Sequence, residues 1–325
     1  MEQQDILSMT LPELQAAVQE LSEPKFRAKQ IFNWLHQKRV TDFSEMTTLS
    51  LPFRERLASD FCINRLKIAK RLASSVDDTV KYLYELPDGN YVETVCMQYH
   101  HGTSLCISTQ VGCRMGCRFC ASAIAGFVRN LTPAEMLLQI YETERAQNCK
   151  ISSLVLMGIG EPLDNFDNVL RFLQLLSDPN GYGMSLRHVT VSTCGVVPKI
   201  LELAEQRLGL TLSVSLHCPN DAGRSAIMPI NRSYPIDVLL DACQTYFEKT
   251  GRRVTFEYAV MDQVNSAEQD AAALAERLKG LHAHVNLIPI NPVKERNFHT
   301  LKKTVLQFQK TLERQRACTV GFLRT

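Results

Sequence analysis

The sequence predicts an α/β fold, in which a partial barrel of six βα units follows a small N-terminal helical domain. Three observations indicate this. Short apolar segments recur between residues 104 and 288, and each is long enough for one strand. Segments with helical periodicity lie between them. A separate helical pattern with many basic residues occupies the first 75 residues. Because strands that alternate with helices form parallel sheets, the barrel portion is of the α/β class.

The helical domain is predicted to contain three helices. Thr10 and Glu13 form a capping box, and apolar residues then recur at helical spacing. A second helix follows Pro24, and a third covers residues 51–61. Residues 24–71 contain eleven Lys and Arg against four Asp and Glu, a net charge of +7 in a chain whose total is +2. An exposed basic segment attracts RNA through its phosphates, although a solvated helix face is the commoner explanation of a charge run.

A β-hairpin is predicted after the helical domain, because residues 80–86 and 91–97 alternate around Pro87-Asp88-Gly89-Asn90. The predicted domains are therefore a helical domain, a hairpin connector, the barrel, and a C-terminal helix with a short strand. Their ranges are 1–75, 76–98, 99–298 and 299–325.

The barrel strands are predicted at residues 104–109, 153–157, 188–192, 211–215, 254–260 and 283–288. Helices are predicted between them, notably at residues 198–206, 236–249 and 267–279. A further helix begins at Thr132-Pro133-Ala134-Glu135, which has a capping residue, proline at the first helical position and glutamate at the third.

Composition bounds the class of protein. A chain of 325 residues that is 45% hydrophobic can bury a substantial core. No apolar run approaches the ~18 residues of a membrane helix, and the first residues lack the features of a signal peptide. We therefore expect a cytoplasmic protein without a membrane partner. The eleven cysteines favour reduced thiols with metal or catalytic roles over a disulfide framework.

Cys113, Cys117 and Cys120 place three thiols within eight residues. Thiolate sulfur suits iron-sulfur clusters and zinc, and three cysteines would leave one iron of a four-iron cluster open to a small molecule. Gly112 and Gly116 favour a loop that curls around a bulky group. The alternatives are a structural zinc site, which usually closes with four ligands, and three unrelated buried thiols.

The C-x-x-x-C-x-x-C spacing resembles the signature of the radical S-adenosylmethionine (SAM) superfamily. From about residue 11 to about residue 320 the chain is similar to the RlmN/Cfr family of radical SAM RNA methyltransferases. The resemblance implies a radical SAM barrel, a 4Fe-4S cluster on the three cysteines, and SAM on the open iron. It also implies that the helical domain at residues 1–75 docks RNA. It is carried by Ser104-Leu105-Cys106-Ile107-Ser108-Thr109-Gln110-Val111-Gly112-Cys113, Arg129-Asn130-Leu131-Thr132, Gly158-Ile159-Gly160-Glu161-Pro162-Leu163, Ser213-Val214-Ser215-Leu216-His217 and Asn286-Leu287-Ile288-Pro289-Ile290-Asn291-Pro292.

The resemblance also implies site residues, most of them at strand ends, where α/β barrels collect their chemistry. The implied SAM contacts are Gly160, Glu161, Ser192, Ser215, Leu216, His217 and Asn291. Glu93 would be a proton acceptor, and Cys106 would resolve a covalent adduct between RNA and protein. From the residues alone, Glu93 is an exposed strand carboxylate, Cys106 a buried strand thiol, the glycine segment a turn and His217 a core histidine.

The implied activity is methylation of carbon 2 of adenine in 23S rRNA, and RlmN-like members also act on tRNA. Cfr-like members use carbon 8. Neither carbon can attack the methyl group of SAM, so the family methylates a C-terminal cysteine and transfers the methyl group through a SAM-derived radical. An electron donor such as flavodoxin is implied. The alternatives are another radical SAM reaction and a noncatalytic RNA-binding iron-sulfur protein.

The C-terminal region departs from the family pattern. The family continues into Asp-Ile-x-Ala-Ala-Cys-Gly-Gln-Leu, which supplies the methyl-carrying cysteine, whereas this sequence ends at Thr325. We therefore expect the methyl-transfer step to be altered or absent. Cys318 is a substitute candidate, although it aligns with the strand before that motif.

Overall fold

The structure is a computed structural model that describes residues 3–291, 293–315 and 319–322. The chain folds as two compact units. Unit 1 contains the described parts of Met1–Val111, Asn130–Ile159 and Asn165–His188, and unit 2 contains those of Gly112–Arg129, Gly160–Asp164 and Val189–Thr325. The boundaries predicted after residues 75, 98 and 298 follow sequence motifs and stay a prediction.

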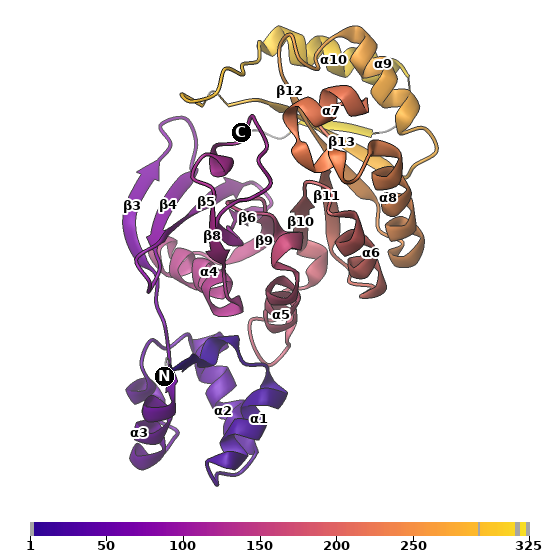
Figure 1. Cartoon of the computed structure of the whole chain (residues 1–325). Coiled ribbons are helices and arrows are strands. Elements are labelled where there is room, and N and C mark those ends of the chain that lie inside the picture. Colours follow the sequence, from indigo (N-terminus) through magenta and orange to yellow (C-terminus); the bar gives the residue numbers. More distant parts are fainter. Residues whose placement is uncertain (1–2, 292, 316–318, 323–325) are drawn as a thin grey trace. The chain divides into compact units, whose positions relative to one another are not determined.

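The N-terminal part of unit 1 contains the three predicted helices, which are α1 (Leu11–Glu20), α2 (Phe26–Asn33) and α3 (Leu51–Asp60) (Figure 1). The capping box of α1 is present, since the Glu13 carboxylate accepts the Thr10 backbone N–H at 2.8 Å. A cap of this kind stabilises a helix by about 1 kcal/mol. A π-helical turn at Trp34–Lys38 follows α2, and Arg39 ends it with a φ of +56°.

Five strands of unit 1 pair side by side in the order β9-β6-β5-β4-β3. Strands β6 and β9 are parallel and the other neighbours are antiparallel. The hairpin of β4 and β5 was predicted, but β3 was not, because its residues were assigned to the helical domain. Every residue of β3 is exposed, so it lacks the alternating apolar pattern of a half-buried strand. The strands are β3 (Lys67–Ala73), β4 (Val80–Glu85), β5 (Tyr91–Tyr99), β6 (Gly102–Cys106) and β9 (Ile151–Leu156).

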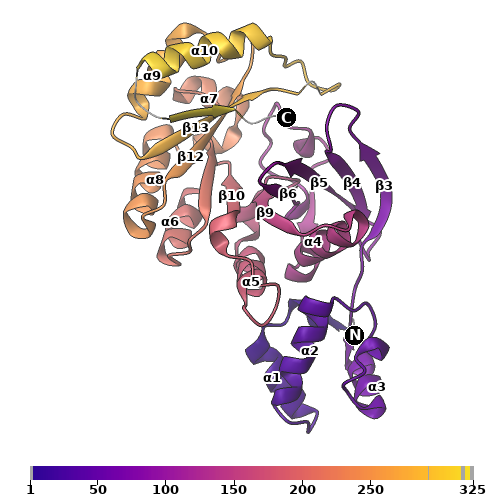
Figure 2. The same cartoon turned by 180° about the vertical axis from the view of Figure 1, so that it is seen from behind.

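Helix α4 (Pro133–Gln147) covers one face of this sheet (Figures 1 and 2). Its buried polar side chains have partners, as expected for buried polar groups. The Gln139 side-chain oxygen accepts hydrogen bonds from the Thr94 hydroxyl at 2.9 Å and from the Ser108 N–H at 2.8 Å. The Thr143 and Tyr84 hydroxyls are 2.9 Å apart. Helix α5 (Phe166–Ser177) completes unit 1, and Arg171 on it pairs with Glu13 at the start of α1.

Unit 2 contains a parallel sheet in the order β14-β13-β12-β11-β10. Counting β6 and β9, all six predicted barrel strands are present, with ends within three residues of those predicted. Helices α6, α8, α9 and α10 lie along the unit 2 sheet (Figures 1 and 2). The strands are β10 (Val189–Thr193), β11 (Thr211–Ser215), β12 (Val254–Val260), β13 (Ala283–Pro289) and β14 (Thr319–Phe322), and the helices are α6 (Val197–Glu205), α8 (Ile236–Thr250), α9 (Glu268–Arg277) and α10 (Lys302–Arg314).

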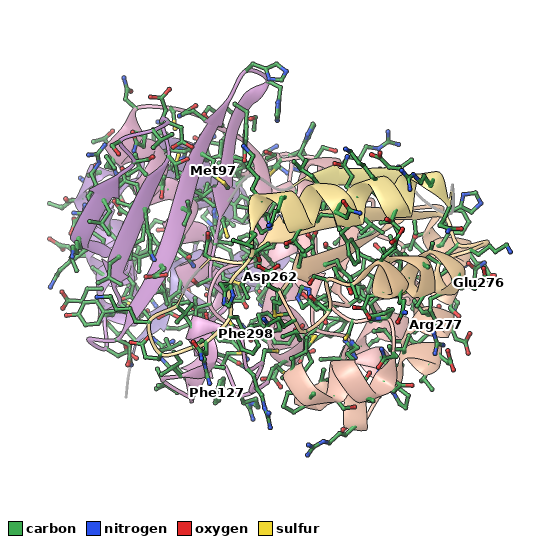
Figure 3. The ribbon with its side chains drawn as sticks, turned by 90° about the horizontal axis from the view of Figure 1, so that it is seen from above. Met97, Phe127, Asp262, Glu276, Arg277 and Phe298 are labelled. Carbon is green, nitrogen blue, oxygen red and sulfur yellow. The ribbon has the colours of Figure 1, made fainter. Side chains whose placement is uncertain are left out.

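The segment before α10 is fastened to the end of β12. The Asp262 carboxylate accepts the Leu301 N–H at 2.9 Å, and the Asp262 N–H donates to the His299 carbonyl at 3.0 Å. Phe298 packs against a buried cluster that includes Cys194; Figure 3 labels Asp262 and Phe298. Within the described ranges, no helix has both the length and the apolar character needed to cross a membrane.

Candidate active site

The three predicted cluster ligands lie in unit 2, in a loop that follows β7 (Gln110–Gly112). All three thiols are partly buried. The Cys113 N–H donates to the Gly126 carbonyl at 2.8 Å. Gly112 has a φ of +72°, and a Cβ atom there would lie 1.8 Å from the same carbonyl oxygen. Only glycine fits this position, because it has no Cβ atom and adopts a positive φ without strain.

Burial keeps the Cys113 and Cys117 thiols protonated in the absence of a cation. Burial raises the pKa of Cys113 to about 11 and that of Cys117 to about 12, and the neighbouring thiols and the Glu161 carboxylate add to both shifts. No three His, Cys, Asp or Glu side chains converge around the position of a single metal ion in the part of the chain that the structure describes. A bound cationic group would favour the thiolate forms.

Contacts on both sides hold the cysteine loop. The Arg118 N–H donates to the Ile227 carbonyl at 2.9 Å. Arg114 pairs with Asp164 at 2.9 Å between Nε and Oδ2, and its guanidinium lies 3.8 Å from the centre of the Phe127 ring. The loop is therefore anchored at several residues between its cysteines.

Glu161 lies in unit 2 with only 4% of its surface exposed. Its carboxylate accepts the Cys194 N–H at 2.7 Å and the Leu163 N–H at 3.0 Å. Burial raises the pKa of Glu161, and these hydrogen bonds oppose the shift. Gly160 before it has a φ of +112°, a conformation that glycine adopts without strain. The arrangement presents a buried carboxylate, which suits an ammonium group.

His217 lies just after β11 and has a left-handed φ of +56°, which is unusual for a residue other than glycine. Its Nδ1 accepts the Ala259 N–H at 2.9 Å, so the proton of the neutral ring is on Nε2. Burial lowers the pKa of His217 to about 3, and Arg224 adds to the shift. The ring packs edge-on against Phe119 of the cysteine loop, with ring centres 4.8 Å apart. The structure thus brings two separately predicted segments into contact.

The other predicted SAM contacts are also in unit 2. Ser192 lies in β10 and Ser215 ends β11, and both are half-buried, whereas Leu216 is fully buried. Asn291 is exposed, and no hydrogen bond described for it joins it to the others. Cys318 falls outside the residues that the structure describes.

Glu93 and Cys106, the predicted catalytic residues, lie close to each other in unit 1. Glu93 is on β5, where its carboxylate pairs with Lys81 Nζ at 2.6 Å, and 41% of its side chain is exposed. Cys106 is the last residue of β6. Burial raises the pKa of the Cys106 thiol to about 11, and the Glu93 carboxylate adds to this shift.

Two residues of the site were not predicted from the sequence, namely Phe119 and the fully buried Arg224. Phe119 sits between two predicted ligands, so its position in the motif was a signal for a contact role. Arg224 carried no such signal, because an arginine in a short helical pattern is expected at the surface.

Comparisons with known proteins match both parts of the chain. Residues 4–63 match the model of the ribosomal RNA large subunit methyltransferase N-terminal domain. Residues 107–275 match the model of the radical SAM superfamily. These ranges include the three helices of the helical domain and four of the six barrel strands; β6 and β13 lie outside them.

Similar proteins cover nearly the whole chain. A protein of Lachnoclostridium phytofermentans named "Probable dual-specificity RNA methyltransferase RlmN" is 50% identical over 316 residues, which are 96% of this chain and 88% of that protein. A protein of the same name from Clostridium novyi is 47% identical, over 95% of this chain and 90% of its own.

A solved structure gives the same result. The crystal structure of a radical SAM methyltransferase from Sphaerobacter thermophilus matches with a TM-score of 0.94 and 38% identity, covering 99% of this chain and 96% of that one. The predicted fold class, a partial radical SAM barrel with a small helical domain, is confirmed. This chain belongs to the RlmN family of radical SAM RNA methyltransferases.

Proposed function

We propose that this chain is an RlmN-like enzyme that acts on carbon 2 of adenine in 23S rRNA and in tRNA, with a 4Fe-4S cluster on Cys113, Cys117 and Cys120 and with SAM beside it. Its methyl-transfer step stays predicted to be altered or absent. The contact between His217 and Phe119 is the observation that carries the proposal, because it joins a predicted SAM segment to the predicted cluster loop. The names of the relatives, which specify dual-specificity RNA methyltransferases, support the substrates.

The residues present fit these groups. Three cysteine thiols are soft ligands of the kind that iron-sulfur clusters take, and the buried Glu161 carboxylate suits the amino group of SAM. The bound cluster and SAM would supply one-electron chemistry, which can functionalise a carbon atom that is not a nucleophile. The donor set is therefore consistent with the cofactors that the family uses.

The remaining SAM contacts would orient the cofactor. His217 is neutral and its Nδ1 is occupied, so its Nε2–H can donate one hydrogen bond to a ribose or carboxylate oxygen. Ser215 and Ser192 supply hydroxyl groups from neighbouring strands. Asn291 would add its amide from the segment after β13.

Glu93 and Cys106 would act on the RNA. A thiol with a pKa of about 11 is not a nucleophile at neutral pH until a base takes its proton. The Glu93 carboxylate is near enough to raise that pKa, and the family gives Glu93 the role of proton acceptor. Cys106 would then resolve the adduct between RNA and protein.

The RNA would dock on unit 1, which carries the domain matched to ribosomal RNA methyltransferases and the whole basic segment of residues 24–71. Lys25, Lys29 and Lys38 are exposed on or beside its helices. We further propose a cytoplasmic enzyme, since its substrates are ribosomal and transfer RNA, and a one-electron donor such as flavodoxin.

Mass spectrometry of RNA digests tests the proposal. RNA that lacks the modification is incubated without oxygen with the reconstituted full chain, SAM and a reductant. Complete methyl transfer would give 2-methyladenosine, whereas cleavage of SAM with unmodified adenine would agree with an altered or absent transfer step. A Cys117→Ser variant should give neither result, whereas Cys62→Ser, at a cysteine outside the site, should retain activity. Detection of 8-methyladenosine would instead assign Cfr-like specificity. A cluster-loaded protein that leaves SAM intact would be an RNA-binding iron-sulfur protein and not an enzyme.

A further inference from the structure

Arg224, on the short helix α7 (Asp221–Ile227), is completely buried and makes four hydrogen bonds. Its Nε donates to the Leu216 carbonyl at 3.2 Å and its Nη1 to the Asn231 side-chain oxygen at 2.9 Å. Its Nη2 donates to the carbonyls of Cys194 at 2.7 Å and Ser215 at 3.0 Å. All four acceptors are neutral oxygens.

Three of these acceptors belong to segments that carry proposed SAM contacts. Ser215 and Leu216 are themselves such residues, and they lead into His217. Cys194 follows β10, and its N–H donates to the Glu161 carboxylate at 2.7 Å. A single guanidinium group therefore fixes the end of β11 relative to the segment that orients Glu161.

The cysteine loop rests on the same helix. The last residue of α7, Ile227, accepts the Arg118 N–H at 2.9 Å. Cys117 and Phe119 pack against the buried cluster that contains Cys194, Ile227 and its neighbour Met228. The helix that carries Arg224 therefore contacts the cysteine loop, while the Arg224 side chain binds the segments with the proposed SAM contacts.

Among the described residues, no carboxylate is a hydrogen-bond partner of Arg224. Asn231 links Arg224 to Asp221. The Asn231 Nδ2 donates to the Asp221 carboxylate at 2.9 Å, and the Asn231 Oδ1 accepts a hydrogen bond from Arg224. A buried cation without a contacting anion is unfavourable. An anionic group bound to the neighbouring cysteine loop would offset that cost.

We propose that Arg224 is a positioning residue of the SAM and cluster site, which aligns the SAM segments with the cysteine loop and whose charge makes the cluster easier to reduce. The inference rests on the proposed function. Reduction adds negative charge to a cluster, and a nearby buried cation stabilises the added charge because the local dielectric constant is low.

Two variants separate alignment from charge. Arg224→Gln removes the charge and most of the hydrogen-bond donors. Arg224→Lys keeps the charge, but it lacks the planar guanidinium group that donates to all four acceptors. Arg252→Gln is the matched control, because Arg252 donates to Leu210 and Thr211 at the opposite end of β11. The anaerobically reconstituted full chains are compared by redox titration followed by electron paramagnetic resonance, and SAM affinity is measured by calorimetry.

For Arg224→Gln we expect a tenfold loss in the reduction equilibrium constant, which is a shift of about 59 mV to more negative potential, and SAM binding at least tenfold weaker. For Arg224→Lys we expect the potential of the control and SAM binding at least tenfold weaker. If Arg224→Gln fails to take up a cluster, the reduction potential and the SAM affinity of Arg224→Lys alone test the two roles.

Wild-type SAM affinity in either variant would overturn the alignment role. Equal potentials in the Arg224→Gln variant and the control, or equal shifts in both Arg224 variants, would overturn the charge role. If the wild-type chain takes up no iron-sulfur cluster, the proposed function fails first and this inference fails with it.

Discussion

Burial holds individual titratable side chains of this protein in one protonation state. His36 is the clearest example outside the candidate site. It is fully buried, and its Nδ1 lies 2.9 Å from the Tyr141 hydroxyl of α4. Burial lowers the pKa of His36 from 6.5 to about 4. Because protonation is disfavoured only in the folded state, His36 makes the stability of unit 1 depend on pH.

The sign of this dependence follows from the lowered pKa. The contribution of His36 to the free energy of unfolding is fully present above pH 6.5 and is lost as the pH falls toward 4, with a total of about 3 kcal/mol. Urea unfolding between pH 7 and pH 4 should therefore show a flatter pH dependence for His36→Gln than for wild type. His188→Gln, at an exposed histidine, is the control, and identical slopes in both variants would contradict the account.

The Glu161 carboxylate should govern SAM affinity. Glu161→Gln keeps the size and an acceptor oxygen but loses the charge, and a hydrogen bond to a charged group contributes about 1.5–3 kcal/mol. We expect SAM to bind the cluster-loaded variant about ten to one hundred times more weakly in calorimetry. The control is Asp167→Asn, at an exposed carboxylate on α5. Wild-type affinity in Glu161→Gln would exclude the ammonium contact.

The sequence predicts candidate reactive residues of the site, but it carries no signal for Arg224, a residue that supports them. Glu161 and His217 stand in segments that resemble family motifs, so their types and spacing were informative. Arg224 donates to backbone carbonyls of segments that lie apart in the sequence, and a local sequence pattern cannot predict such contacts. The left-handed φ of His217 likewise depends on packing around Asn265, which donates to its carbonyl.

At the scale of elements, the cysteine loop depends on two glycines with different surroundings. Both Gly112 and Gly116 have a φ near +70°, where an L-residue costs about 1–2 kcal/mol. A Cβ at Gly112 would also collide with the Gly126 carbonyl at 1.8 Å, whereas at Gly116 it would meet only Pro229 Cγ at 3.6 Å.

These two positions form a matched pair for mutation. We expect Gly112→Ala to lose most of its iron after anaerobic reconstitution and Gly116→Ala to keep it, because only the first must displace backbone. Iron is measured per chain, and thermal unfolding checks that both variants fold. Equal iron content in the two variants would show that the backbone before Cys113 does not need its observed conformation.

Elements with strong local signals were predicted well. The capping boxes at Thr10 and Thr132 mark the starts of α1 and α4 in both sequence and structure. Strand β3 was missed because it is an edge strand with both faces exposed, so its residues show no apolar alternation. Its pairing with β4 is a contact that only the fold supplies.

At the scale of the whole molecule, the basic residues of unit 1 should bind RNA phosphates. Strand β3 places Lys67, Lys70 and Arg71 on an exposed sheet edge, and the structure describes no ion pair for them within the residues that it covers. Each phosphate contact contributes about 0.7 to 0.9 to the slope of log affinity against log salt.

Replacing these three residues by glutamine should weaken RNA binding and reduce the magnitude of that slope by about 2. Fluorescence anisotropy with labelled RNA at several salt concentrations measures both quantities. Lys302→Gln with Lys303→Gln, on the exposed side of α10 in unit 2, is the control and should change the slope little. An unchanged slope in the triple variant would remove β3 from the RNA surface.

The central claim is that three thiols hold a cluster next to bound SAM, and production of 5′-deoxyadenosine measures it most directly. Oxygen-free, reconstituted protein given SAM and a one-electron reductant should release 5′-deoxyadenosine, and the Cys117→Ser variant should release none. A colourless protein that carries zinc at these cysteines and leaves SAM uncleaved would contradict the account.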